Sequence, residues 1–290
     1  MIELRTIDTL AQQEWLDRTS QTVQQAVQGI FKAGGAVAHP VADALHGTWL
    51  GHPLHPVLTD IPIGAWTVAL VLDALGAISE RDFEAGADAA IALGLAGAVG
   101  AAASGLTDWK ELDTKPLRTG LIHGTLNLGA TALYTISLVL RRRGARAAGQ
   151  GTALLGYLAM TLAAYLGGDL VYRDQIGVSH TNPVWEPLKF APVLAESDLV
   201  EGEPRLVEVA ERRIVLVRQD GRIYALAERC SHLGGPLADG IVEDGCIQCP
   251  WHGSRFALAD GRPVTGPATI PQPSFETRVR NGQIEVRAAD

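Results

Sequence analysis

Four long apolar stretches in the middle of the chain constrain its fold more than any other feature. They cover residues 58–79, 86–107, 119–140 and 152–172. Each is close to the length of about 20 residues that a helix needs to cross the hydrocarbon core of a membrane. The second and third stretches show almost no polar face at a helical period, whereas helices of a soluble bundle would show one. The sequence therefore predicts four transmembrane helices.

Small residues within these stretches indicate how the helices pack. Glycine recurs at helical spacing in Gly94-x-x-Gly97-x-x-Gly100 and in Gly120-x-x-x-Gly124. Because lipid is as apolar as the helices, their association depends on close approach of the backbones, which glycine allows. We expect a compact four-helix bundle within residues 51–173.

The segments on either side of the bundle are more polar. Residues 1–50 have no apolar core near Met1, so we expect no cleavable signal peptide. They predict an amphipathic helix that lies on the membrane surface or packs against the last domain or a second subunit. Its apolar side chains are Leu10, Leu16, Val23, Val27, Ile30 and Phe31. After the bundle, residues 174–190, with Pro183 and Pro187, have the composition of a linker to a last domain at 191–290.

Four crossings would place both termini on the same side of the membrane. The arginines at 141–143 and 146 favour a cytoplasmic location for the loop that contains them. Lys110, Lys115, Arg118 and Arg173 lie near helix ends on the other face, and a polar tail without a signal is easier to leave inside the cell. The sequence therefore does not decide on which side of the membrane the termini lie. The polar N-terminal tail favours the cytoplasmic side.

Ionisable residues gather at the bundle end that shares a side with the last domain. They are His52, His55, Asp60, Asp108, His123 and Asp169. Because such residues are costly inside a bilayer, they suggest a second functional site. Four interpretations remain open: hydrogen-bonding residues that cap helix ends, a quinone or proton-transfer pocket, haem ligation by His55 or His123, and a non-haem metal. The opposite end has carboxylates and arginines but no histidine.

The last hundred residues have the pattern of a small antiparallel β-domain. Runs at 205–209 and 214–217 are apolar or alternating at strand length, and 278–287 contains two more such runs. Asp220-Gly221, Asp260-Gly261 and Asn281-Gly282 are typical hairpin turns. The fold class is therefore α+β and multidomain, with a four-helix transmembrane bundle followed by an antiparallel β-domain.

Two short motifs in this domain combine thiols and imidazoles. Cys230-Ser-His232 and Cys249-Pro-Trp-His252 each offer one sulfur and one nitrogen donor. A [2Fe–2S] cluster of the Rieske type needs two cysteines on one iron and two histidines on the other. Gly234, Gly235 and Gly253 would let the backbone approach inorganic sulfide closely. A structural Cys2His2 zinc site is the alternative.

With these motifs, the chain resembles the Rieske ferredoxin family over about residues 191–288. The resemblance implies Cys230, His232, Cys249 and His252 as cluster ligands, and Ser254 as a hydrogen-bond donor to a bridging sulfide. A third loop, Thr265-Gly-Pro-Ala268, could cover the cluster. Gly235 and Trp251 stand where high-potential Rieske proteins carry an extra disulfide, which favours the ferredoxin type.

The remaining cysteine, Cys246, precedes the second motif in a predicted strand. We expect it to be a small buried apolar residue. Since two of the three cysteines are assigned to the cluster, no intramolecular disulfide is expected.

Residues 52–62 resemble a little-characterised family of bacterial four-helix membrane domains (DUF2231-like). This resemblance implies a fold and a multi-pass protein of the bacterial cytoplasmic membrane, and it implies no activity. Lipid would then surround the bundle, and association into a homo-oligomer is left open.

Together these patterns predict a membrane-anchored Rieske protein that carries single electrons to a redox protein or a quinone. The alternatives are a quinol-oxidising subunit and an electron-supplying component of an oxygenase. A stand-alone oxygenase would need a further large domain with its own iron site, so we expect an electron-transfer component. A net charge of −8 without a concentrated basic patch makes nucleic acid an unfavourable partner.

Overall fold

The computed structural model describes residues 13–79, 81–181, 189–209 and 211–288. The chain forms two compact units. The bundle unit comprises residues up to His39 together with Leu54–Ile176, and the β unit comprises Pro40–Pro53 together with the chain from Gly177 onward. Leu10 of the predicted amphipathic helix, and Pro183 and Pro187 of the predicted linker, lie outside the described residues.

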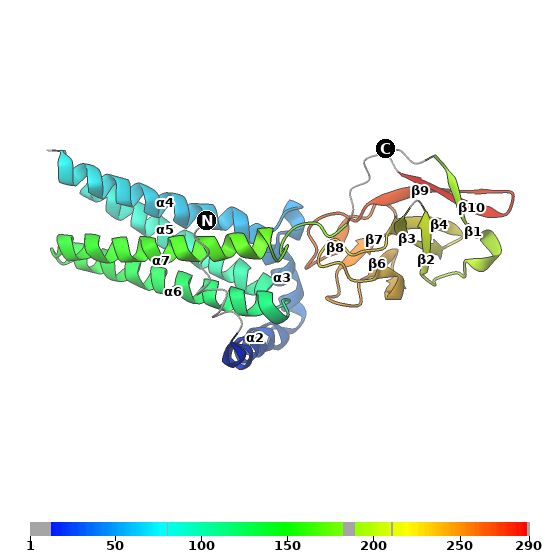
Figure 1. The fold of residues 1–290 in the computed structure, drawn as a ribbon, viewed down its shortest axis with the longest axis horizontal. Helices are drawn as coiled ribbons and strands as arrows, with labels where there is room; N and C mark the ends of the chain where they lie inside the picture. The colour runs from blue at the N-terminus through cyan, green and yellow to red at the C-terminus, as the bar shows by residue number, and fades with distance from the viewer. Residues whose placement is uncertain (1–12, 80, 182–188, 210, 289–290) are drawn as a thin grey trace. The chain divides into compact units, whose positions relative to one another are not determined.

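Long helices make up the bundle unit (Figure 1). They are α2 (Glu14–Ala33), α4 (Leu54–Ile78), α5 (Glu84–Trp109), α6 (Thr114–Arg142) and α7 (Arg146–Tyr172), and the short α3 (Ala38–His46) follows α2 in the chain. The helices pack most closely within two hairpins, α4 on α5 and α6 on α7.

Three of the described helices are long and apolar enough to cross a membrane: α4, α5 and α7. The remaining predicted span, residues 119–140, lies within α6, which is of similar length. Lys115 and Arg118 in its first turns, His123 and Asn127 further on, and Arg141 and Arg142 at its end reduce its apolar character. The predicted count of four spans is therefore not confirmed for α6.

Aromatic stacking and small residues form the interior of the bundle. The rings of Trp66 and Tyr134 stack with centroids 4.1 Å apart and planes inclined by 15°. A side chain at Gly94 of α5 would overlap the indole of Trp66, so glycine is needed for the close approach of α4 and α5. Ile91 and Ala130, both fully buried, complete the contact.

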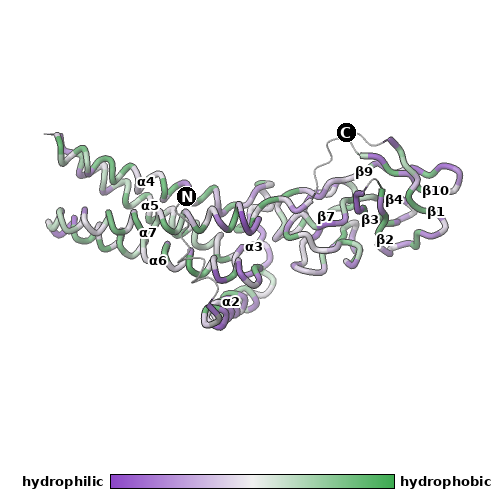
Figure 2. The backbone as a smooth tube through the Cα atoms, in the orientation of Figure 1, coloured by the Kyte–Doolittle hydropathy of each residue, from purple (hydrophilic) through white to green (hydrophobic). Residues whose placement is uncertain are grey.

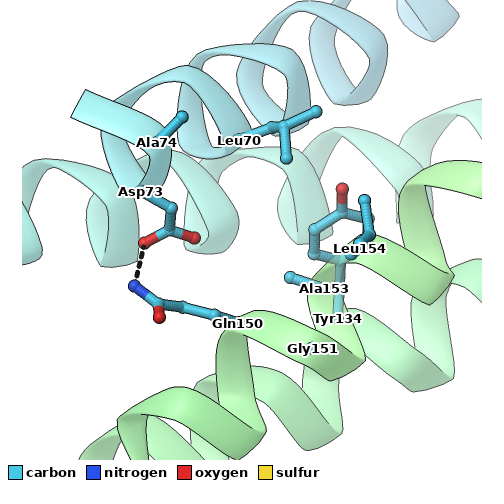
Figure 3. Close-up of a pocket in the computed structure, with 8 residues that line it drawn as sticks. All are labelled: Leu70, Asp73, Ala74, Tyr134, Gln150, Gly151, Ala153 and Leu154. Atoms are coloured by element: carbon cyan, nitrogen blue, oxygen red, sulfur yellow. Dashed lines mark hydrogen bonds between the residues drawn. The ribbon is translucent and has the colours of Figure 1, made fainter. Parts of the chain in front are cut away.

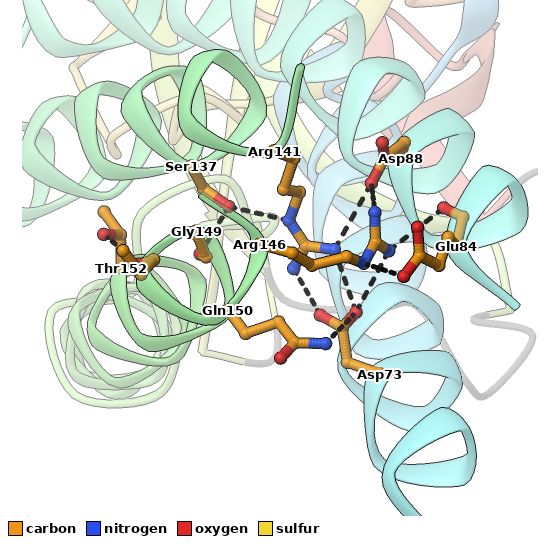
Figure 4. Close-up of polar contacts among 10 residues, drawn as sticks. Asp73, Glu84, Asp88, Ser137, Arg141, Arg146, Gly149, Gln150 and Thr152 are labelled. Atoms are coloured by element: carbon orange, nitrogen blue, oxygen red, sulfur yellow. Dashed lines mark hydrogen bonds and ion pairs between the residues drawn. The ribbon is translucent and has the colours of Figure 1, made fainter. Parts of the chain in front are cut away.

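At one end of the bundle, polar and charged groups from α4, α5, α6 and α7 form a network (Figure 4). Arg141 of α6, whose side chain is fully buried, pairs with Asp73 of α4 and, at 3.3 Å, with Asp88 of α5. Arg146 of α7 lies 3.2 Å from Asp88. Gln150 of α7 donates to Asp73 at 3.2 Å. Because each buried charge has a partner of opposite sign, this network joins both hairpins without leaving an uncompensated charge.

The polar helix α2 packs on the turn between α5 and α6. Gln24 donates hydrogen bonds to the carbonyl groups of Lys110 (3.0 Å) and Leu112 (2.7 Å), which follow the end of α5. Arg118 pairs with Asp17, and Leu16 is buried. Figure 2 shows the mixed hydrophilic and hydrophobic colouring along α2 that such a partly solvated helix has.

The β unit contains two antiparallel sheets. The six-stranded sheet has the order β1-β10-β9-β4-β3-β2, and the four-stranded sheet the order β5-β6-β7-β8. The strands of the larger sheet are β1 (Ala191–Ala195), β2 (Arg205–Val209), β3 (Arg212–Gln219), β4 (Arg222–Ala227), β9 (Ser274–Arg280) and β10 (Gln283–Ala288). Those of the smaller sheet are β5 (Ile241–Glu243), β6 (Cys246–Gln248), β7 (Arg255–Ala257) and β8 (Pro263–Thr265).

The predicted turns connect these strands. Asp220-Gly221 joins β3 to β4, Asn281-Gly282 joins β9 to β10, and Asp260-Gly261 lies between β7 and β8. Asp244-Gly245, which the sequence analysis did not single out, joins β5 to β6 with positive φ at both residues. In the smaller sheet, the motif cysteine Cys249 comes directly after the end of β6.

The contact between Gly94 and Trp66 gives a test of bundle packing. Gly94→Ala should destabilise the bundle by about 1–3 kcal/mol, because the new methyl group overlaps the indole ring. The measurement is the thermal unfolding midpoint in detergent, followed by circular dichroism.

Gly124→Ala on α6 is the matched control, since no atom lies within 4 Å of the position its Cβ would take. Equal midpoints for the two variants would contradict the packing described here.

Candidate metal centre

Two turns of the same construction carry the four predicted ligands. In the first, Cys230 donates its N–H to the carbonyl of Gly235 (2.8 Å) and accepts the N–H of Gly234 (2.8 Å). In the second, Cys249 donates to Ser254 (2.8 Å) and accepts from Gly253 (3.1 Å). Gly234 and Gly253 hold equivalent positions at φ of +77° and +75°, where a side chain would be strained. Each turn therefore presents its cysteine and histidine from a fixed backbone.

The two thiols lie together and face backbone donors. The N–H groups of His232 and Leu233 point at the sulfur of Cys230, and those of Trp251 and His252 point at the sulfur of Cys249. The thiol of Cys230 donates a hydrogen bond to Cys249, which lowers the pKa of Cys249 to about 6 and, together with burial, raises the pKa of Cys230. Such donors suit thiolates that bind metal, because they balance sulfur charge in a buried place.

The imidazoles of His232 and His252 lie beside each other, with ring centroids 5.0 Å apart and planes at 85°. A metal ion bound to imidazole lies about 3.2 Å from the ring centre, given a metal–nitrogen distance of about 2.0–2.1 Å. Two imidazoles on one tetrahedral ion would then have centroids about 5 Å apart. The observed spacing fits one ion shared by both rings, and both rings are half-buried.

Glycine at position 235 is required by the closeness of the two turns. A Cβ there would lie 2.8 Å from the Cys249 sulfur and 3.0 Å from the Trp251 ring. Gly235 and Trp251, the two positions named for an extra disulfide, are thus neighbours across the turns. Trp251 is 57% exposed, so its ring covers the second turn from the solvent side.

A buried glutamine that the sequence analysis missed braces the first turn. The side-chain oxygen of Gln272 accepts the N–H of Ser231 (3.0 Å), and its amide donates to the carbonyl of Ala227 (2.6 Å). The hydroxyl of Ser231 donates to the carbonyl of Ile270 (2.7 Å). The segment before β9 therefore holds the ligand-bearing turn in place. A lone glutamine with no local motif gives no signal in a single sequence.

Ser254 and the third loop are joined by a hydrogen bond. The hydroxyl oxygen of Ser254, which is fully buried, accepts the N–H of Ala268 at 3.0 Å. Its proton therefore remains available to a further acceptor. The predicted loop at residues 265–268 thus packs directly behind the second turn.

The third loop is also held by the segment of residues 40–53, which belongs to the β unit. Asp43 accepts the N–H of Gly266 at 2.7 Å. A Cβ on Gly266 would lie 3.0 Å from the Thr48 hydroxyl and 3.3 Å from the ring of His46, which is itself buried. In the sequence these residues belong to the predicted N-terminal helical segment, and no local pattern indicates that they contact this loop.

The structure brings together two of the six residues suggested for a second site. His55 of α4 and His123 of α6 lie in the bundle unit with ring centroids 6.3 Å apart. Asp60 on α4 is exposed, Asp108 on α5 is half-buried, and Asp169 on α7 pairs with Arg173 at 3.2 Å. His52 belongs to the β unit and is exposed.

A pocket of about 270 Å³ lies in the bundle unit near the charged network (Figure 3). It is lined by Leu70, Asp73, Ala74, Tyr134, Gln150, Gly151, Ala153 and Leu154. Its polar groups are engaged with one another, since Gln150 donates to Asp73. It contains none of the residues suggested for the second site.

Two family models match the chain. The Rieske [2Fe-2S] domain matches residues 189–276, and the predicted membrane protein family DUF2231 matches residues 51–180. The fold and the donor set define an electron-transfer protein of the iron–sulfur class. The chain belongs to the Rieske [2Fe-2S] family, joined in this case to a DUF2231 domain.

Known relatives share the Rieske part. The ferredoxin subunit of anthranilate 1,2-dioxygenase from Burkholderia cepacia is 32% identical over 102 residues, which are 35% of this chain and 90% of that protein. Apoptosis-inducing factor 3 from Homo sapiens is 29% identical over 117 residues, and the chain covers only 19% of its length.

Among solved structures, the ferredoxin of carbazole 1,9a-dioxygenase from Nocardioides aromaticivorans IC177 is 27% identical. It aligns with a TM-score of 0.33 over 34% of this chain and 97% of that one.

The hydrogen bond from Gly266 to Asp43 predicts a stabilising role for residues 40–53. Asp43→Ala should cost about 1–3 kcal/mol, because the N–H of the buried Gly266 would lose its partner. The measurement is the temperature at which the visible absorbance of the bound cluster is lost. Asp43→Asn, which keeps an acceptor oxygen, should recover most of the loss, and an unchanged midpoint in Asp43→Ala would refute this role.

Ser254 should affect the reduction potential. Ser254→Ala is expected to lower it by about 60 mV, equivalent to about 1.4 kcal/mol for one electron, since a donor that stabilises added negative charge is removed. The control is Ser231→Ala, because the proton of that hydroxyl is already donated to Ile270. Redox titration followed by circular dichroism measures both, and equal shifts would contradict the proposed role of Ser254.

Proposed function

We propose that this protein is a membrane-anchored Rieske electron carrier in which Cys230 and Cys249 bind one iron and His232 and His252 bind the other. The observation that supports it best is the pair of equivalent turns, which bring the two thiols next to each other and the two imidazoles next to each other. The similarity to ferredoxin subunits supports the same class of function. A bound [2Fe–2S] cluster would supply a centre that accepts and releases one electron.

The chain's own residues set the conditions for that exchange. Four backbone N–H groups face the two sulfurs, so the turns need no rearrangement when charge is added there. The two imidazoles are half-buried whereas both cysteines are buried, so the histidine side is the one that a partner can approach. We assign electron entry and exit to His232 and His252.

We further propose that α4, α5, α6 and α7 all cross the membrane, with both termini on one side. Three of them meet the requirements of length and composition. For α6, the buried pairing of Arg141 with Asp73 supports the same assignment, because it removes the most costly charge from contact with lipid. Anchoring would raise the effective concentration of the cluster at a membrane-bound partner.

The partner is proposed to be a redox protein that takes electrons for an oxygenase or another membrane acceptor. The names of several relatives, such as the ferredoxin subunit of anthranilate 1,2-dioxygenase, favour an oxygenase-type acceptor. A quinone as acceptor is the second candidate, and the membrane domain favours it.

The cluster assignment is tested with detergent-purified protein. We expect two iron atoms per chain and the electron paramagnetic resonance signal of a reduced Rieske cluster. Cys249→Ser should abolish both, because a thiolate ligand is lost. Cys246→Ala should retain both, since Cys246 is a buried free cysteine in β6 that follows no ligand pattern. Stoichiometric zinc without iron in the wild-type protein would overturn the assignment.

A further inference from the structure

The imidazoles of His55 and His123 occupy an unusual place in the bundle unit. His55 lies in the first turn of α4 and His123 within α6, so the two hairpins each contribute one ring. The centroids are 6.3 Å apart and the planes are inclined by 82°. Neither ring takes part in the charged network at the other end of the bundle.

Both rings are held in the same way. The Nδ1 atom of His55 lies 2.8 Å from the carbonyl oxygen of Ala101 on α5, and that of His123 lies 2.8 Å from the carbonyl oxygen of Ala163 on α7. Since a carbonyl only accepts, each Nδ1 carries the proton and each Nε2 carries a lone pair. A histidine whose Nδ1–H is fixed by a carbonyl has the orientation and tautomer of a metal ligand.

Glycines make this arrangement fit. A Cβ on Gly105 of α5 would lie 2.7 Å from the His55 ring, and one on Gly167 of α7 would lie 3.2 Å from the His123 ring. Each hairpin thus pairs a histidine with a glycine on the partner helix. In both hairpins the histidine has a carbonyl acceptor and a glycine on the partner helix. A histidine that only capped a helix end would not need both.

The lone pairs have few partners. Asn127 donates its amide to Nε2 of His123 at 3.1 Å. Within the described residues, Nε2 of His55 has no hydrogen-bond partner. The lone pair of the His55 Nε2 is therefore not engaged by another described protein group.

The spacing identifies the kind of ligand. By the geometry applied to His232 and His252, two imidazoles on opposite sides of one metal ion would have centroids about 6.4 Å apart. The 6.3 Å between His55 and His123 matches this opposed arrangement, whereas the 5.0 Å of the first pair matches adjacent ligands. The rings are therefore spaced as axial ligands.

The small number of protein donors near these rings further restricts the kind of metal centre that they could bind. In the described part of the chain, no third histidine, cysteine, aspartate or glutamate side chain joins His55 and His123 in a group that could hold a metal ion. A free ion would need more donors than two imidazoles, but haem iron already has four nitrogens from its ring and needs only two axial ligands. Covalent attachment is excluded because the three cysteines lie at 230, 246 and 249.

We propose that His55 and His123 are the axial ligands of a non-covalently bound haem held between the α4–α5 and α6–α7 hairpins. This haem would give the bundle unit a one-electron centre of its own. The assignment deepens the proposed electron-carrier function, and it is tested separately because the cluster ligands lie in the β unit.

The experiment uses the full-length protein, produced with added haem precursor and purified in detergent. Pyridine haemochrome analysis should find one haem per chain, and the spectrum of the reduced protein should show the bands of a six-coordinate haem. His55→Ala and His123→Ala should each lose the haem while keeping the iron–sulfur signal. His39→Ala, which removes an exposed imidazole on α3, should keep both.

Two further variants separate ligation from a structural role. Asn127→Ala should retain haem, because Asn127 only occupies the lone pair that iron would take. His55→Gly should regain haem when imidazole is added, which shows that the bundle still folds.

A wild-type protein that has the iron–sulfur signal but no haem would overturn the haem site and leave the electron-carrier proposal intact. Haem that persists in both histidine-to-alanine variants would also overturn it. A wild-type protein that has haem but no iron–sulfur signal would instead refute the cluster assignment alone.

Discussion

The β unit depends on the burial of two thiols that must carry negative charge when they bind iron. Sulfur charge in a buried place is unfavourable unless donors face it, and four backbone N–H groups do so here. The N–H groups can converge only because Gly234 and Gly253 take positive φ and Gly235 leaves room for the second turn. The braces from Gln272, Ser254 and Asp43 then hold the turns and the third loop, so backbone contacts fix the positions of the donors.

The bundle unit also contains buried charge, but it stabilises that charge with side chains. It buries charge by pairing side chains across helices instead of directing backbone donors at it, because helical N–H groups are already used within each helix. Arg141 meets carboxylates from α4 and α5, and Arg146 reaches the same carboxylates from α7. One end of the bundle is thereby held by ion pairs, while the end with the histidines has hydrogen bonds from ring nitrogens to backbone carbonyls.

Local patterns in the sequence were sufficient for much of this structure. The cysteine and histidine spacings, with glycine four residues after each cysteine, mark both turns, and the Asp-Gly and Asn-Gly pairs mark hairpins that the β unit contains. The contact of Asp43 with Gly266 joins residues 223 positions apart and follows no periodicity, so it could not be predicted. The span predicted at residues 119–140 is not confirmed, because polar residues such as His123 and Asn127 interrupt the apolar character of α6.

The two histidine pairs show why residue type alone cannot assign a site. Both pairs offer two imidazoles at a near-perpendicular inclination, and both occur once in their unit. The pairs differ in ring spacing and in their neighbours. His232 and His252 belong to turns that also carry two thiols. His55 and His123 contact backbone carbonyls, glycines and the amide of Asn127. In the proposed cluster, His232 and His252 would supply two donors to one iron, and the bridging sulfides would connect it to the iron held by the thiols. In the proposed haem site, His55 and His123 would supply two donors and the cofactor would supply the other four. The sequence placed all four histidines as candidates, but only the spacing of their rings separates the two kinds of chemistry.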